Sequence, residues 1–168
     1  MRLLALALIL VFVPGVACSN GSKRDDAPPM TTHDSPAQTA ATPSVSIVTP
    51  KGDATVSVEI VSTAPKIERG LMYREHLPPD GGMLFLMGKE HDWAFYMRNT
   101  LIPLDMIFIT RDLTIAGIVE NAEPKTETLR KVDTPSLYVL EVNGGWTASH
   151  HVKAGAKVRF DGVKATVR

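Results

Sequence analysis

The residues best suited to chemistry gather in one short segment between two apolar stretches. Residues 95–105 read FYMRNTLIPLD and contain Arg98, Asn99, Thr100 and Asp105. An arginine, an amide and a carboxylate held in one loop could orient a polar ligand through fixed hydrogen bonds. Asn, Thr and Asp also satisfy backbone groups within loops, and this structural role is slightly favoured by the residue types alone.

Two charged residues elsewhere join this loop in a candidate ligand-binding set. Arg69 lies on a predicted helix, and Glu141 lies on a predicted strand. The full set is Arg69, Arg98, Asn99, Thr100, Asp105 and Glu141. An enzyme is the alternative to a binding site, with Asp105 and Glu141 as the acid and base. That role requires the two carboxylates to flank one cleft, about 5 to 10 Å apart, with at least one displaced pKa.

Methionine and histidine suggest a third chemistry, the binding of Cu(I) by thioether and imidazole groups. The residues concerned are Met72, Met83, Met87, Met97, Met106, His76 and His91. Met83, Met97 and Met106 lie in apolar runs, where methionine commonly fills gaps in a core. Core packing is therefore the favoured interpretation, and we predict neither a metal site nor a cofactor.

Several other functions are disfavoured by composition and motif. Lys and Arg number 18, as do Asp and Glu, so the formal net charge is zero and no basic run attracts nucleic acid. The sequence has no phosphate-binding loop, no Gly-x-Ser-x-Gly motif and no His-Glu-x-x-His motif. Ser149 precedes two histidines, but adjacency along the chain does not align a nucleophile with its base. No catalytic residue is assigned.

The elements that would position these residues are short and mostly extended. Alternating apolar residues predict a strand from Thr55, and Thr63 followed by Pro65 predicts the start of a helix over 65–74. Gly70 within that helix indicates close backbone packing. Further strands are predicted at 83–87 and 93–97 (a hairpin), 106–110, 113–119, 137–142, 158–160 and 163–167, with a helical turn at 146–151. We therefore expect a mainly β (α+β) fold: a small barrel or sandwich of about eight short strands with one or two short helices.

The first eighteen residues are typical of an export signal. Arg2 supplies a positive charge, an apolar run follows from Leu3 to Val13, and small residues precede Cys18, the only cysteine. This pattern resembles bacterial lipoproteins, in which cleavage before the cysteine leaves it diacylated. An ordinary cut would instead leave a free thiol in an oxidising compartment. Ser19 rather than Asp after the cysteine favours the outer membrane over the inner one.

Residues 19–53 are predicted to be a disordered tether, because Pro, Ser, Thr and Ala dominate them and large apolar residues are few. Residues 44–48 could add an edge strand. A single domain is expected over residues 54–168.

Four motifs in the expected order resemble domain-of-unknown-function family 192. They are RGLMYR at 69–74, GGMLF at 81–85, MRNTLIPLD at 97–105 and LEV at 140–142. The resemblance covers about residues 55–160 and implies a compact, mostly β fold, often exported, with no settled activity. Asn143-Gly144-Gly145 replaces a turn that is more usually Pro-Ala-Gly-like. Ala156 stands where an Asp often follows Gly155, which weakens any metal site using that carboxylate.

Together these observations predict an envelope-anchored, non-catalytic binding or accessory module facing the periplasm. Its partners would be the membrane, through a lipid on Cys18, and a small polar ligand or envelope component bound near Arg69, Asn99, Thr100 and Asp105. An enzyme using Asp105 and Glu141 and a Cu(I)-binding protein are the alternatives. The sequence indicates no oligomeric state.

Overall fold

The described part of the chain is a single curled sheet with two short helices. The computed structural model describes residues 42–164, so Cys18, most of the predicted tether and the end of the predicted closing hairpin lie outside the described residues. The elements, in order, are β1 (Ser44–Thr49), β2 (Gly52–Val61), α1 (Ala64–Arg69), β3 (Gly81–His91), β4 (Leu104–Ile109), β5 (Ile115–Ala122), β6 (Ser136–Asn143), α2 (Trp146–Ser149) and β7 (Val158–Asp161). The predicted mainly β fold with short helices is confirmed.

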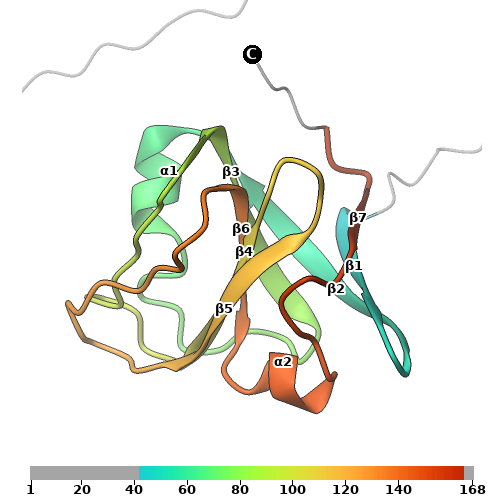
Figure 1. Ribbon diagram of the computed structural model, residues 1–168. Helices are drawn as coiled ribbons and strands as arrows, with labels where there is room; N and C mark the ends of the chain where they lie inside the picture. Colours follow the sequence, from blue (N-terminus) through green and yellow to red (C-terminus); the bar gives the residue numbers. More distant parts are fainter. Residues whose placement is uncertain (1–41, 165–168) are drawn as a thin grey trace, which may run out of the picture. The chain divides into compact units, whose positions relative to one another are not determined.

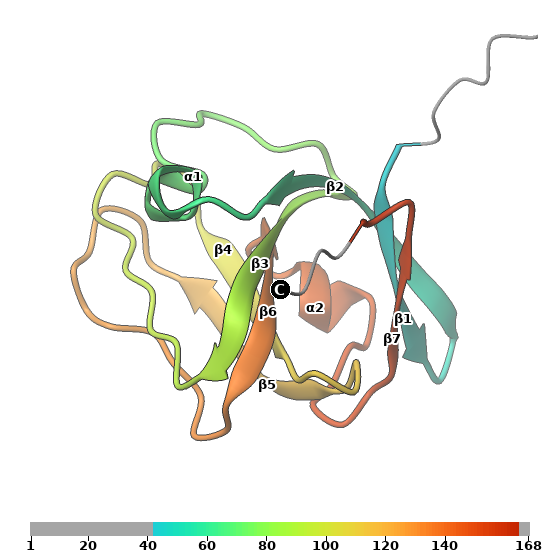
Figure 2. The same cartoon turned by 90° about the horizontal axis from the view of Figure 1, so that it is seen from above.

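The seven strands of the described chain form one sheet in the order β5-β4-β6-β3-β2-β1-β7. Neighbours are antiparallel except β2 and β3, which are parallel and are joined by the segment that carries α1 (Figure 1). The sheet curls into a half-barrel, as the view from above shows (Figure 2). Its two ends are linked by hydrogen bonds from Val158 N to Leu113 O (2.9 Å) and from Ile115 N to Ala156 O (3.0 Å).

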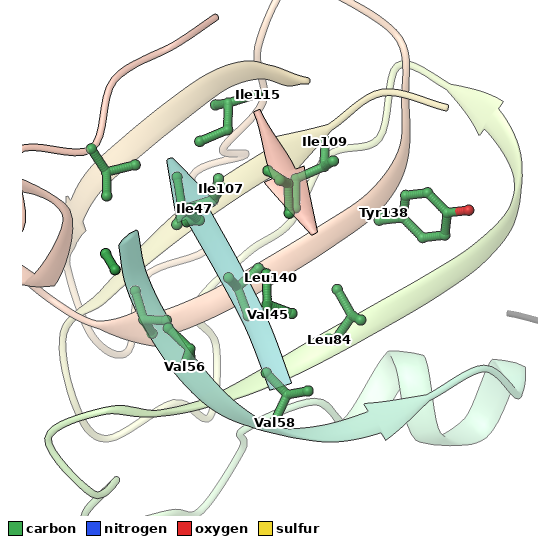
Figure 3. Close-up of a cluster of buried hydrophobic side chains, with 14 of the residues drawn as sticks. Val45, Ile47, Val56, Val58, Leu84, Ile107, Ile109, Ile115, Tyr138 and Leu140 are labelled. Atoms are coloured by element: carbon green, nitrogen blue, oxygen red, sulfur yellow. The ribbon is translucent and has the colours of Figure 1, made fainter. Parts of the chain in front are cut away.

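A first core fills the inside of this curl. Successive side chains of a strand point to opposite faces of the sheet. The side chains that point into the curl are mostly branched aliphatic residues, and they come from most of the strands. Val45 and Ile47 of β1 face Ile107 of β4 and Leu140 of β6 across the interior (Figure 3). Trp146 of α2 packs against the same core. Burial of this aliphatic surface is the main force that holds the curl together.

The position of β1 differs from its sequence-based interpretation as a possible edge strand within the tether. It lies between β2 and β7, and Val45 and Ile47 are completely buried. The folded part therefore includes residue 44, ten residues before the predicted domain start at 54. The sequence pattern that would predict this strand is weak, because only two large apolar residues alternate here and Pro, Ser and Thr surround them.

A second core covers the outer face of β3, β4 and β6. Met83 and Phe85 of β3, Met106 and Phe108 of β4 and Val139 of β6 belong to it. Leu71, which follows α1, and Met97, in the connection between β3 and β4, cover these side chains. The sheet is thus buried on both faces in its centre, which explains why its central strands read as continuous apolar runs.

Two predicted elements have different bounds in the structure. The predicted hairpin over 83–97 is wrong: β3 continues to His91, and residues 93–97 contribute only an isolated bridge between Phe95 and Arg130. Trp93, Phe95 and Met97 alternate because they pack across the second core, not because they pair in the sheet.

Helix α1 begins at Ala64, one residue before the predicted start at Pro65, and it ends at Arg69, five residues before the predicted end. Gly70 adopts a positive φ of 44°, and a Cβ at this position would lie 3.2 Å from the Phe85 ring. The close packing predicted at Gly70 is confirmed. None of the helices within residues 42–164 has the length and apolar character needed to cross a membrane.

Candidate ligand pocket

A cavity of about 220 Å³ opens on the outer side of the sheet, within the second core. Its walls come from α1 and the residues after it, from β3, and from the segment that follows β3. Its lining residues are Ile67, Glu68, Arg69, Gly70, Leu71, Met72, Phe85, Met87, Trp93, Ala94, Phe95, Tyr96, Thr100 and Glu141. Most are apolar or aromatic, which is the composition typical of small-molecule sites.

Glu141 is the only acidic side chain of this lining that is buried. It lies in the middle of β6, paired with Met83 of β3 on one side and Met106 of β4 on the other. Only 4% of its surface is exposed. No described residue donates a hydrogen bond to its carboxyl group, and burial alone raises its pKa from 4.5 to about 8. At neutral pH this group is therefore mainly the uncharged acid.

Aromatic rings form much of the wall of the cavity that Glu141 also lines. Phe85 and Phe95 meet edge to face with their centroids 5.3 Å apart, and Phe95 meets Phe108 in the same way at 6.1 Å. Trp93 and Tyr96 complete the aromatic part of the lining. No aromatic residue belongs to the sequence-based site set, because the apolar character of residues 93–97 predicts a buried strand.

The mouth of the pocket carries the other charges. Glu68 and Arg69, adjacent at the end of α1, are both exposed, whereas Thr100 is buried and adds a hydroxyl group to the lining. Arg69, Thr100 and Glu141 are thus the sequence-selected residues that the structure brings together in one cavity.

Arg98 and Asn99 lie beside the cavity and line a separate shallow hollow that also includes Arg69. The Arg98 guanidinium bonds Glu127 at 2.9 Å and lies 5.2 Å from the centre of the Tyr96 ring. The Asn99 amide donates to the Met72 sulfur at 3.8 Å. The Asn99 contact, together with the hydrogen bond from Tyr73 N to Asn99 O (2.8 Å), holds the loop against the residues that follow α1.

Asp105 lies outside the pocket lining. Its Oδ1 accepts hydrogen bonds from the backbone N–H groups of Asn121 (2.8 Å) and Gly145 (3.0 Å). Its Oδ2 accepts from both the backbone N–H (2.8 Å) and the hydroxyl (2.6 Å) of Thr147. Asp105 is completely buried, so it ties the start of α2 to the β5 strand and has the structural role that the sequence left open.

Strand register also separates the two carboxylates considered for an enzyme. Asp105 pairs with Val142, and Glu141 pairs with Met106, in adjacent rows of the β4–β6 ladder. Because successive side chains point to opposite faces, Asp105 faces the side of the first core and Glu141 the side of the second. The pair does not flank a common cleft, and the acid–base arrangement has no geometric support.

The methionines divide into two groups. Met83, Met97 and Met106 are buried in the second core, whereas Met72 and Met87 line the cavity. Neither His76 nor His91 belongs to that lining. Within residues 42–164 no three His, Cys, Asp or Glu side chains cluster in a way that could hold a metal ion.

Comparison with known proteins places this architecture in a family. The chain is 38% identical to a protein from Sinorhizobium meliloti 1021, named as a candidate transcription regulator, over 72% of this chain and 95% of that one, with a TM-score of 0.69. It is also 38% identical to a protein of unknown function from Novosphingobium aromaticivorans DSM 12444, over 69% and 83%, with a TM-score of 0.67. No curated protein matches. The model of family DUF192, described as "Uncharacterized ACR", matches residues 46–160, and the chain belongs to this family.

Proposed function

We propose that this domain is a non-catalytic binding module that holds a small, largely apolar molecule in the pocket beside α1. The observation that carries the proposal is Glu141, a buried carboxyl group without a partner among the described residues, which lines an apolar cavity. Burial without a protein donor disfavours the charged form of this carboxyl group and raises its pKa. A ligand that supplies a partner inside the cavity would give this carboxyl group a function.

The pocket also supports the proposal that the module is non-catalytic. Glu141 has no second buried carboxylate beside it, because Asp105 lies on the other face of the sheet. Thr100 is the buried hydroxyl of the lining, and no histidine in that lining could serve as its base. Binding, rather than bond cleavage, is what these groups can do together. The two thioethers of Met72 and Met87 fit the same role, since they give a polarisable wall to an organic ligand.

We place the module at the cell envelope, for reasons that come from the sequence. The leader and Cys18 are typical of a lipoprotein, and the Pro- and Ser-rich stretch before β1 would hold the domain away from a membrane. The regulator name of the S. meliloti protein is not part of the proposal. A chain with equal numbers of acidic and basic residues gives no reason to expect a nucleic acid partner.

Ligand-observed NMR on the purified protein tests this function. A panel of small aromatic and aliphatic compounds is screened against the wild type and against Ala94→Phe, which adds a ring at an exposed position of the pocket lining. Val48→Phe, on exposed β1 surface away from that lining, is the matched control. We expect compounds that bind the wild type and Val48→Phe but not Ala94→Phe. A panel with no binder, or binders unaffected by Ala94→Phe, would contradict the proposal.

A further inference from the structure

We propose that the ligand is a small organic cation, an ammonium group on a body about the size of one six-membered ring, with Glu141 as its counter-ion. This inference rests on the pocket of the proposed function and specifies what the pocket selects. Three features of the lining lead to it: the unpaired carboxyl group, the aromatic rings around it and the size of the space.

The carboxyl group lacks a positive partner. The charged or titratable groups that share its cavity are Glu68 and Arg69 from α1 and Tyr96 from the segment after β3. Glu68 and Arg69 are exposed at the mouth and adjacent to each other, so their charges largely offset. On the neighbouring strands Glu141 meets only Met83 and Met106. A cation inside the pocket would therefore have Glu141 as its single close counter-charge.

The aromatic lining favours the same sign of charge. The faces of aromatic rings carry negative potential and attract ammonium groups, most strongly for Trp. Trp93, Phe95, Tyr96 and Phe85 all line the cavity that contains Glu141. Rings together with one carboxylate form a site that favours a cation over a neutral molecule of the same shape. An anionic ligand would meet repulsion from the ring faces, and from Glu141 wherever that group is ionised.

The volume limits the size of the ligand. A protein cavity of about 150 Å³ lined by apolar residues holds one benzene molecule. The present cavity of about 220 Å³ leaves room for one ring and a short side arm. 2-Phenylethylamine has these dimensions and is a cation at neutral pH, and 2-phenylethanol is its neutral counterpart of nearly equal shape.

Binding of a cation must be coupled to proton release. In the empty pocket the raised pKa, about 8, keeps most Glu141 side chains protonated at pH 7. An ammonium ligand favours the carboxylate, so about 0.9 proton leaves the protein for each ligand bound at pH 7. Between pH 6 and pH 8 the ionised fraction rises roughly 50-fold, and the affinity for 2-phenylethylamine is expected to rise by the same factor.

Calorimetric titration in two buffers of different ionisation enthalpy measures both the affinity and the released protons. In the wild type we expect 2-phenylethylamine to bind at least tenfold more tightly than 2-phenylethanol at pH 8. Glu141→Gln should abolish the proton release and the pH dependence and should reduce the amine to the affinity of the alcohol. Glu120→Gln removes the same charge at an exposed position of β5 outside the pocket lining, and it should keep both effects.

Two outcomes would overturn the inference: equal binding of amine and alcohol by the wild type, or unchanged amine binding with proton release in Glu141→Gln. Glu141→Leu, an apolar replacement within an apolar core, serves as a second variant and should behave as Glu141→Gln does. If neutral compounds bind the wild type but not Ala94→Phe, and the amine has no advantage over the alcohol, the pocket of the proposed function is supported while the inference of a cation fails. Failure of the inference is therefore distinct from failure of the proposed function.

Discussion

The carboxyl group of Glu141 makes the stability of the domain depend on pH. Its pKa is 4.5 for an exposed group and about 8 in the folded protein. Between these values the folded state keeps a proton that the unfolded state has lost, so the free energy of unfolding decreases as the pH rises through this window. The pKa difference corresponds to a loss of about 5 kcal/mol at most.

Chemical denaturation of the wild type and of Glu141→Gln at pH 5 and pH 8.5 measures this effect. The amide has no proton to lose, so the variant should gain stability relative to the wild type by several kcal/mol at the higher pH. Other titrating groups are shared by the two proteins and cancel in the comparison. Parallel curves for the two proteins would show that Glu141 ionises freely in the folded state.

Asp105 has the opposite character, since each of its oxygens is fully used. Replacing it with Ala leaves the N–H groups of Asn121, Gly145 and Thr147 without their acceptor in a buried place. We expect Asp105→Ala to lower the free energy of unfolding by about 3 kcal/mol or more, and Asp105→Asn by less, because the amide retains one acceptor oxygen. Urea denaturation measures both. Unchanged ligand affinity in folded Asp105→Asn would agree with its separation from the pocket.

At the scale of elements, the end of α1 is set by Gly70 against Phe85. Gly70→Ala introduces a Cβ at a positive φ of 44° and within 3.2 Å of the ring. Gly88→Ala introduces a Cβ at a positive φ of 76° with no neighbour within 4 Å, and it serves as the control for backbone strain. Each substitution should cost about 1 kcal/mol through its backbone. Only Gly70→Ala should also displace Phe85 and weaken binding in the pocket, measured by the same titration.

Elements with strong local signals could be predicted from the sequence, and those that depend on distant partners could not. Alternation predicts β2, short apolar runs predict β4, β5 and β6, and Thr63 with Pro65 predicts the start of α1. The pairing of β1 with β7 joins residues more than a hundred positions apart, which no local pattern reveals. The aromatic segment at 93–97 shows strand-like alternation, yet it packs on a sheet instead of extending one.

The candidate site could also be predicted only in part, because residue type alone does not show which side chains share a cavity. Arg69, Thr100 and Glu141 were selected by type and do share the cavity. Asp105 has an equally suggestive type, but its strand register points it at the other face, and register is a property of the sheet and not of the segment. The importance of Glu141 comes from the absence of a described partner, which only the packed structure shows.

At the scale of the whole molecule, the proposed lipid on Cys18 predicts where the protein is found. Cys18→Ala removes the acceptor for acylation, so the protein should move from the membrane fraction to the soluble fraction. Cell fractionation followed by immunoblotting measures this change, and Ser19→Ala, next to the modified position, is the control that should remain membrane-bound. Membrane association that persists in Cys18→Ala would contradict acylation at this residue.

The side-by-side position of β1 and β7 determines when the domain can finish folding. Ser44 is the register partner of Asp161, so the first and last strands along the described chain pair with each other. A chain that emerges from a ribosome or an export channel with its N-terminus first must wait for residues 158–161 before the curl can close. This distant contact makes closure slow. A chain cut short of residue 158 would leave β1 as an open edge, ready to pair with another molecule.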